Sequence, residues 1–214
     1  MAVVPPVFDA AFRDQLDLLL RWRRDVRHFR PDPLPDGTLA ELVARAALSP
    51  SVGNSQPWRF VEVASVPRRT AIRDEFAACN AAALAAQSDD RAARYARLKL
   101  AGLEAAPLHL AVFCDEATQA GHGLGRATMP ETLRASATGA VFALWLAARA
   151  RGVGVGWVSI LRPAEVQRIL DVPRDWALMA YLCLGFPARE DDVPELEREG
   201  WQGPDSAGLR LHQR

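Results

Sequence analysis

Several stretches of the chain repeat apolar side chains at the spacing of an α-helix. Phe12, Leu16 and Leu19 recur in this way, which predicts an amphipathic helix over about residues 9–22. Further helices are expected over residues 36–48, where Asp36 would be the cap, 67–87, 88–106, 130–151 and 163–170. The centre of the 130–151 helix is apolar almost all round. We therefore expect it to be a fully buried central helix and a candidate for a dimer interface.

Shorter apolar runs bounded by glycine or proline predict the strands. They cover residues 60–63, 108–114, 155–160 and 177–184. Because helices and strands do not alternate strictly, the pattern favours an α+β fold with a central sheet of about four strands flanked by helices. The 214 residues suffice for a single domain with a substantial core. Residues 1–8 and 202–214 are expected to be extended or interface tails.

The amino-acid composition limits the kinds of binding partner that the chain is expected to have. Lys+Arg and Asp+Glu number 26 each, so no net charge favours broad binding to nucleic acid or to an anionic membrane. The three cysteines are far apart in sequence, which favours buried thiols in a reducing compartment over a disulfide framework. The four histidines show no metal-ligand spacing with them, so we expect no metal site. The N-terminus has no basic region of a signal peptide, and we expect a cytoplasmic protein.

The densest charge in the chain follows the first predicted helix. Residues 23–30, here called the arginine segment, read Arg-Arg-Asp-Val-Arg-His-Phe-Arg and precede a Pro-Asp-Pro break. Guanidiniums in this arrangement could bind a phosphate through bidentate hydrogen bonds, and such local basicity suits a small anion. On these residues alone the simpler interpretation is a solvated helix end, with Asp25 in a surface ion pair.

A polar loop and a lone serine are further candidates for ligand contact. In residues 51–56, here called the polar loop, Gly53 permits close approach of a ligand to the backbone. Asn54 and Gln56 could pair with the edge of a heterocycle, although an ordinary connector is the alternative. Ser159 lies at the end of a predicted strand, where it is either a core hydroxyl bonded to backbone or a ligand contact.

A glycine-rich stretch after the 130–151 helix invites comparison with a dinucleotide-binding loop. That fingerprint must follow a strand and open a helix, whereas Gly152, Gly154 and Gly156 follow a helix and open a strand. We therefore reject a dinucleotide site there and expect Gly152 to end the helix.

Two other segments have more than one interpretation. Arg91, Tyr95 and Lys99 share one face of the 88–106 helix, which is either solvated or part of a lid over an anionic ligand. Residues 115–130 have no periodicity, and so long a connection in a compact domain is usually functional or an interface arm.

The chain resembles the flavin-binding nitroreductase-like superfamily, and within it the dimethylbenzimidazole synthase (BluB) branch of vitamin B12 biosynthesis. The resemblance extends from about residue 12 to residue 201. It is carried by the motifs RRDVRHFR (23–30), SVGNSQPW (51–58), YARLKLAGLEAAP (95–107), GLGRATMPET (123–132), LWLAARARGVGVGWVSIL (144–161), LCLGFP (182–187) and PELEREGW (194–201). The aspartate of the first motif and the GVGWVSI segment are the features most specific to the synthase branch.

The resemblance implies a nitroreductase-like fold, with a mostly antiparallel sheet flanked by helices, in an intertwined homodimer whose two chains share each flavin site. Enzymes of this branch use reduced FMN as substrate. With molecular oxygen they fragment it to 5,6-dimethylbenzimidazole, the lower ligand of cobalamin, and erythrose 4-phosphate. The resemblance implies no metal, and a separate flavin reductase would supply the reduced FMN.

The resemblance also assigns roles to residues. Asp25 would be the acid/base of the fragmentation, and Ser159 would bind the flavin near its reacting centre and assist later bond cleavages. The flavin would be contacted by Arg23, Arg24, Asp25, Val26, Arg27, Ser51, Gly53, Ser55, Gln56, Arg91, Leu100 and Ser159.

Three functions are compatible with these features. The first is the oxygen-dependent synthase. The second is an NAD(P)H-dependent nitroreductase or flavin reductase that retains FMN, and the third is a non-catalytic flavin carrier. Asp25 favours the first, because a carboxylate beside the ring is costly without a catalytic use.

Overall fold

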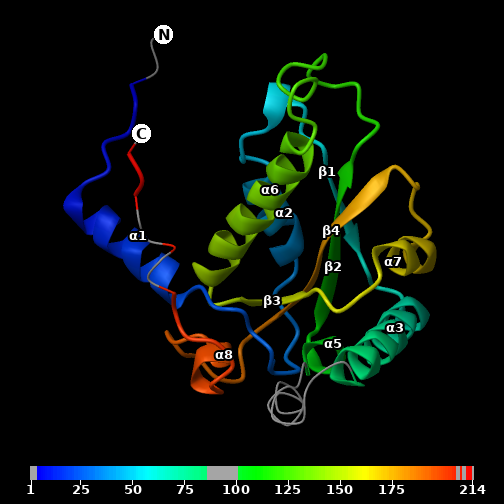
Figure 1. Cartoon of the computed structure of the whole chain (residues 1–214). Helices are drawn as coiled ribbons and strands as arrows, with labels where there is room; N and C mark the ends of the chain where they lie inside the picture. The colour runs from blue at the N-terminus through cyan, green and yellow to red at the C-terminus, as the bar shows by residue number, and fades with distance from the viewer. Residues whose placement is uncertain (1–3, 86–100, 206–207, 209–210, 214) are drawn as a thin grey trace.

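The computed structural model describes residues 4–85, 101–205, 208 and 211–213. It has a central sheet with helices on both faces (Figure 1). In chain order the described elements are α1 (Ala10–Trp22), α2 (Thr38–Ala46), the 3-10 helix η1 (Val52–Asn54), β1 (Trp58–Glu62), α3 (Val66–Ala85), α5 (Gly102–Ala105), β2 (Leu108–Asp115), α6 (Thr132–Arg149), β3 (Gly154–Val158), α7 (Pro163–Leu170), β4 (Trp176–Gly185) and α8 (Glu195–Arg198). Most of the helix expected over 88–106 lies outside the described residues.

The four strands form one sheet in the order β1-β2-β4-β3, and all neighbours are antiparallel. The register of β2 against β4 shifts between Val112 and Phe113, which marks a bulge. The predicted α+β class and the four-stranded, mostly antiparallel sheet are confirmed. Each strand begins and ends within two residues of its predicted bounds.

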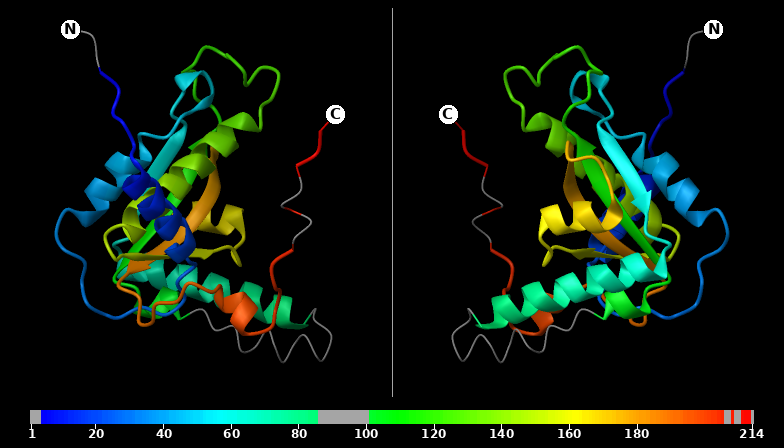
Figure 2. Two further views of the ribbon diagram at one scale, coloured as in Figure 1. Left: turned by 90° about the vertical axis from the view of Figure 1, so that its left-hand side faces the viewer. Right: turned by 90° about the vertical axis from the view of Figure 1, so that its right-hand side faces the viewer.

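Both faces of the sheet are buried, because the side chains of β2 and β4 alternate between two cores. Leu110, Val112 and Leu182 pack with α2 and α6 on one face. Ala111, Phe113 and Tyr181 pack with α3, α5 and α7 on the other. Figure 2 shows α3 and α7 on one side of the sheet and α2 and α6 on the other.

Two sequence expectations about helices were wrong. The N-cap of α2 is Gly37, in a left-handed conformation with φ 80°, and not Asp36. The second concerns α6, which is not fully buried: Leu144 and Trp145 lie in the core, whereas Phe142 is 44% exposed. Its apolar residues exceed what one sheet face can cover, so part of α6 faces outward beside α1 (Figure 1).

The end of α6 forms as expected. Gly152 has φ 70°, and its N–H donates to the Arg149 carbonyl while the N–H of Val153 donates to the Ala148 carbonyl. This is the hydrogen-bond pattern of a Schellman motif with glycine at its left-handed position. Among the described residues, no helix is long and apolar enough to cross a membrane.

Candidate functional site

The arginine segment leaves α1 at Trp22 and meets the free edge of β3 at Asp25 and Val26. The N–H of Val26 donates to the Val155 carbonyl at 3.0 Å, and Asp25 pairs with Val155 in a parallel bridge. Further along, the N–H of Arg30 donates to the Phe186 carbonyl. The interpretation as a solvated helix end was therefore wrong, because the segment covers a sheet edge that would otherwise be unpaired.

Glycines in β3 permit this close approach. A Cβ atom at Gly156 would lie 2.2 Å from the carbonyl oxygen of Val26, and one at Gly154 would lie 2.8 Å from the Val26 side chain. A larger residue at either position would push the arginine segment off the strand. The glycine-rich stretch that resembles a nucleotide loop thus serves to place Asp25.

Asp25 is held at both carboxylate oxygens. Its Oδ1 accepts a hydrogen bond from the Trp157 N–H at 2.8 Å, and its Oδ2 lies 3.5 Å from the Nε of Arg27. Loss of water around the carboxyl raises its pKa, although the Trp157 N–H and the Arg27 charge act in the opposite direction. Its side chain is 36% accessible and lines the cavity described below. A fixed carboxyl with a raised pKa is suited to moving a proton.

The three arginines nearest Asp25 have different surroundings. Arg23 stacks over the rings of Trp145 and Phe142, at 4.9 and 5.7 Å from their centroids. Arg24 donates from Nε to the Asp192 carbonyl at 2.7 Å. Arg24 and Arg27 line the cavity described next, whereas Arg23 is not among its lining residues.

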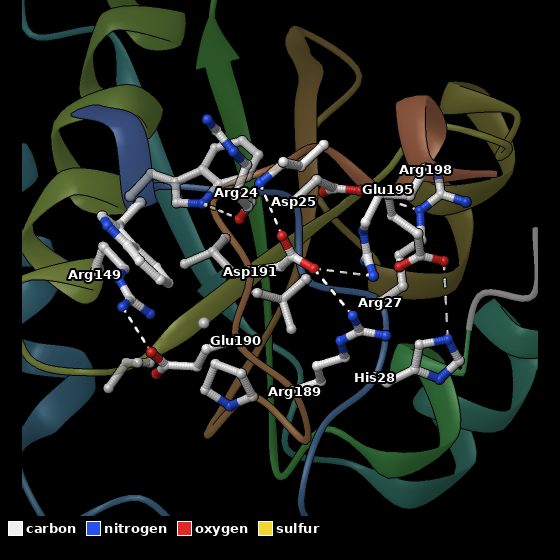
Figure 3. Close-up of a pocket in the computed structure, with 18 of the residues that line it drawn as sticks. Arg24, Asp25, Arg27, His28, Arg149, Arg189, Glu190, Asp191, Glu195 and Arg198 are labelled. Carbon is white, nitrogen blue, oxygen red and sulfur yellow. Dashed lines mark hydrogen bonds and ion pairs between the residues drawn. The ribbon is translucent and has the colours of Figure 1, made fainter. Parts of the chain in front are cut away.

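A cavity of about 190 Å³ lies between the arginine segment and the C-terminal tail (Figure 3). Arginines and carboxylates both line it, and several of them form ion pairs with one another. Figure 3 labels Arg24, Asp25, Arg27, His28, Arg149, Arg189, Glu190, Asp191, Glu195 and Arg198 on its walls. Guanidiniums from distant parts of the chain thus converge on one small space, as binding of a phosphate would require.

The carboxylates of the tail occupy several of these guanidiniums. Glu190 accepts a hydrogen bond from Arg149 at 2.9 Å, and this contact lowers the pKa of Glu190. Asp191 lies within 3.3 Å of Arg189 and 3.1 Å of Arg198. The sequence analysis missed all five of these residues. Arg149 and Arg198 lie in the motifs at 144–161 and 194–201, but neither motif indicates that these residues meet in space, and Arg189, Glu190 and Asp191 lie in no motif.

The polar loop is built by short-range hydrogen bonds and unusual backbone angles. The hydroxyl of Ser51 accepts from the Gln56 N–H at 3.0 Å. Gly53 and Gln56 have positive φ values of 56° and 47°. Ser55 is buried, and its Oγ has no hydrogen-bond partner among the described residues. The loop therefore keeps a buried polar atom that a ligand could satisfy.

Glycines of the 116–131 connection hold the polar loop in place. A Cβ atom at Gly53 would lie 2.9 Å from the Gly121 carbonyl oxygen, and one at Gly121 would lie 2.7 Å from the Gly53 carbonyl oxygen. A Cβ atom at Gly125 would meet Val52 at 2.7 Å. The two backbones touch directly, which supports the expectation of a functional role for this long connection.

Within one chain the polar loop and the arginine segment lie at opposite ends of α6. The Val52 N–H donates to the Ser136 hydroxyl, whereas Trp145 donates from Nε1 to the Arg24 carbonyl. Ser136 and Trp145 are nine positions apart on α6, a rise of about 13 Å. Figure 1 shows η1 and the arginine segment at the two ends of the helix. Within one chain the two sets of candidate residues are therefore separated by the length of this part of α6.

Ser159 comes four positions after Val155, the residue that pairs with Asp25, and it is not among the residues that line the cavity. It follows the last residue of β3, and it is two positions, about 7 Å, beyond the Trp157 N–H that binds Asp25. Its side chain is exposed, so the alternative of a core hydroxyl was wrong. Arg91 and Leu100 lie outside the described residues.

The chain is similar in sequence to proteins of one family. The profile of the Nitroreductase family matches residues 20–186. A 5,6-dimethylbenzimidazole synthase from Rhodospirillum rubrum is 64% identical over 197 residues, which are 92% of this chain and 93% of that protein. A second synthase of that name, from Rhodobacter capsulatus, is 50% identical over 195 residues, 91% of this chain and 94% of that protein.

Solved structures agree on the fold. An iodotyrosine deiodinase with bound FMN and 3-iodo-L-tyrosine superposes with a TM-score of 0.70 at 24% identity, covering 82% of this chain and 91% of that one. A nitroreductase-like protein from Streptococcus mutans also gives 0.70, at 18% identity, covering 96% of this chain and all of that one. The sequence relatives confirm the resemblance stated above and the expectation of an oxidoreductase. The chain therefore belongs to the nitroreductase family, in the branch that contains the 5,6-dimethylbenzimidazole synthases.

Proposed function

We propose that this protein fragments reduced FMN with molecular oxygen, giving 5,6-dimethylbenzimidazole and erythrose 4-phosphate. The observation that carries the proposal is the fixed, desolvated carboxyl of Asp25 beside a cavity lined by arginines. The two synthases that are 64% and 50% identical to this chain support the same reaction. The iodotyrosine deiodinase, which has the same fold, binds FMN.

The residues present fit a flavin nucleotide. Arg24 and Arg27 would hold its phosphate in the cavity, joined by Arg189 and Arg198 once these release the tail carboxylate Asp191. Ser55 has a buried hydroxyl and Arg23 a buried Nε, neither with a hydrogen-bond partner among the described residues. Such orphaned atoms, one in each half of the candidate site, suit the polar edges of a heterocycle.

Bound reduced flavin supplies the electrons and the carbon skeleton, and the protein supplies proton transfer and enclosure. With its raised pKa, Asp25 can both hold and accept a proton, and the Trp157 hydrogen bond and the Arg27 ion pair fix its direction. Ser159, exposed directly after β3, offers a hydroxyl two positions beyond Trp157. Trp145 and Trp157 pack together under the arginine segment and exclude water there.

A complete site would need a second copy of the chain. The polar loop of one chain and the arginine segment of its partner would meet if two copies packed along the outer faces of α1 and α6. These faces expose apolar side chains, including Phe12 at 46%, Leu16 at 38% and Phe142 at 44%. Exposed apolar area of this kind supports the proposal of a homodimer. A separate flavin reductase would supply reduced FMN.

The test is anaerobic mixing of the protein with reduced FMN, followed by admission of air and chromatography of the products. The proposal expects 5,6-dimethylbenzimidazole in the aerated sample and none in a sample kept anaerobic. If only oxidised FMN is recovered, the synthase proposal fails. Hydride transfer from NADPH would then separate a reductase from a flavin carrier.

A further inference from the structure

A buried carboxylate outside the cavity binds the segment that carries Ser159. Glu75 lies on α3 and is only 7% exposed. Its Oε1 accepts hydrogen bonds from the backbone N–H and the Nε of Arg162, at 3.1 and 2.8 Å, and its Oε2 accepts from the terminal guanidinium nitrogen at 2.6 Å. Cys79 adds a fourth contact through its thiol at 3.2 Å.

Arg162 is the last residue of the short connection between β3 and α7. That connection begins at Ser159, directly after β3. Its first end is fixed by strand pairing, since Val158 lies opposite Tyr181 in β4. Glu75 fixes the other end through both backbone and side chain of Arg162, so the four residues 159–162 are held between two anchors.

Simple bracing of α3 against α7 would not require this pair. Ile72 and Val166 already belong to the apolar core between these helices, which lie side by side in Figure 1. Arg68 also joins them, with a hydrogen bond at 3.0 Å to the Leu170 carbonyl at the far end of α7. The Glu75 carboxylate is buried but the Arg162 side chain is 65% accessible, so the ion pair itself adds little net stability, whereas its three hydrogen bonds impose a defined geometry on Arg162. Glu75 thus fixes the position of residues 159–162 specifically.

We propose that Glu75 is a positioning residue, which holds residues 159–162 so that Ser159 faces the reacting part of the flavin. The inference rests on the proposed function, in which Ser159 contacts the flavin. Glu75 itself touches no ligand and acts through Arg162.

The test compares Glu75→Gln with Arg68→Ala, a matched control that loosens the same two helices at the other end. Hydrogen exchange of the ligand-free full-length protein is followed by mass spectrometry in peptides covering residues 158–162. Product formation from reduced FMN and the dissociation constant of oxidised FMN are measured on the same variants. Arg162→Lys keeps the backbone hydrogen bond and one charge, and it serves as a graded variant if Glu75→Gln folds poorly.

We expect Glu75→Gln to speed exchange in residues 158–162 and to slow product formation by about 10- to 100-fold, the scale of a misplaced catalytic group. The dissociation constant of FMN should change less than about threefold, because phosphate binding does not involve Glu75. Arg162→Lys should fall between wild type and Glu75→Gln. Arg68→Ala should leave exchange in this segment unchanged.

Wild-type exchange and turnover in Glu75→Gln would overturn the proposal. So would exchange that rises equally in Glu75→Gln and Arg68→Ala throughout α3 and α7, since that would show a structural brace only. If the wild type forms no product, the proposed function fails and the positioning role fails with it. If the wild type and Glu75→Gln both form product at the same rate, the positioning role of Glu75 fails while the proposed function stands.

Discussion

The two ends of α6 carry the two halves of the candidate site, and they are built by different physical means. At its C-terminal end the arginine segment is held by backbone pairing to β3 and by a hydrogen bond from Arg24 to the Asp192 carbonyl of the tail. At its N-terminal end the polar loop is held by backbone contact between Gly53 and Gly121. The arrangement at the C-terminal end fixes the positions of ionisable groups, and the arrangement at the N-terminal end shapes one wall of the candidate site. Proton transfer should therefore depend on the first end, and fit of the ring on the second.

The largest expected effect is on product formation, and it comes from a substitution in the arginine segment that leaves flavin binding intact. Asp25→Asn keeps the shape but cannot exchange a proton, so product formation should fall by about 100-fold or more. Binding of oxidised FMN should stay near the wild-type value. Asp32→Asn is the matched control, because Asp32 lies two positions after the end of the arginine segment and 58% of its side chain is accessible. Normal turnover by Asp25→Asn would remove Asp25 from the chemistry.

The next effect concerns affinity. Arg24→Ala removes a guanidinium from the cavity and should weaken FMN binding by about 1–3 kcal/mol, the scale of one charge-assisted contact. Titration of flavin fluorescence measures it. Arg30→Ala is the control, since Arg30 pairs with Asp32 outside the cavity. Equal dissociation constants for wild type and Arg24→Ala would contradict a phosphate role.

At the other end of α6, two glycines of the same connection form an internal control. Gly121 and Gly123 have nearly equal φ values of 77° and 79°, but a Cβ atom at Gly121 would meet the Gly53 carbonyl whereas one at Gly123 would meet nothing within 4 Å. Gly121→Ala should therefore weaken FMN binding by about 1–2 kcal/mol more than Gly123→Ala. Equal binding by the two variants would show that the backbone contact does not shape the loop.

The smallest effect is a pH dependence of stability remote from both ends. The hydrogen bonds that Glu75 accepts from Arg162 lower the pKa of Glu75 from 4.5 to about 2. As pH falls the unfolded chain binds the proton first, so this stabilisation is complete above about pH 4.5 and is lost between there and about pH 2. The difference in Tm between wild type and Glu75→Gln should thus shrink as pH falls from 7 to 3. A constant difference would argue against an ionised Glu75.

The sequence predicted the sheet and most of the described helices, because periodicity carries that information, and its local charge marked the arginine segment as a candidate. It did not predict that the segment pairs with β3. The need for glycine at positions 154 and 156 becomes clear only in the folded chain, where Val26 lies against both residues. Local patterns report on local structure, whereas edge pairing is decided by tertiary contacts.

The walls of the cavity were harder to predict for a related reason. Arg24 and Asp192 are 168 residues apart in sequence, and nothing in a charge pattern shows which carboxylates meet which guanidiniums. Likewise, the apolar pattern of α6 indicated burial, but it could not distinguish the core around Leu144 from the outward face around Phe142. An apolar residue left exposed in one chain is understood only when its partner is known.

The most direct test of the account is complementation between two inactive variants. Asp25→Asn impairs the arginine segment, and Gly53→Val impairs the polar loop. If each site combines the segment of one chain with the loop of its partner, a mixed dimer contains one intact site. Unfolding and reassembling the two variants together should then recover about a quarter of wild-type product formation, since half the dimers are mixed and each has one working site of two. No recovery from dimers shown to be mixed would contradict a site shared between chains.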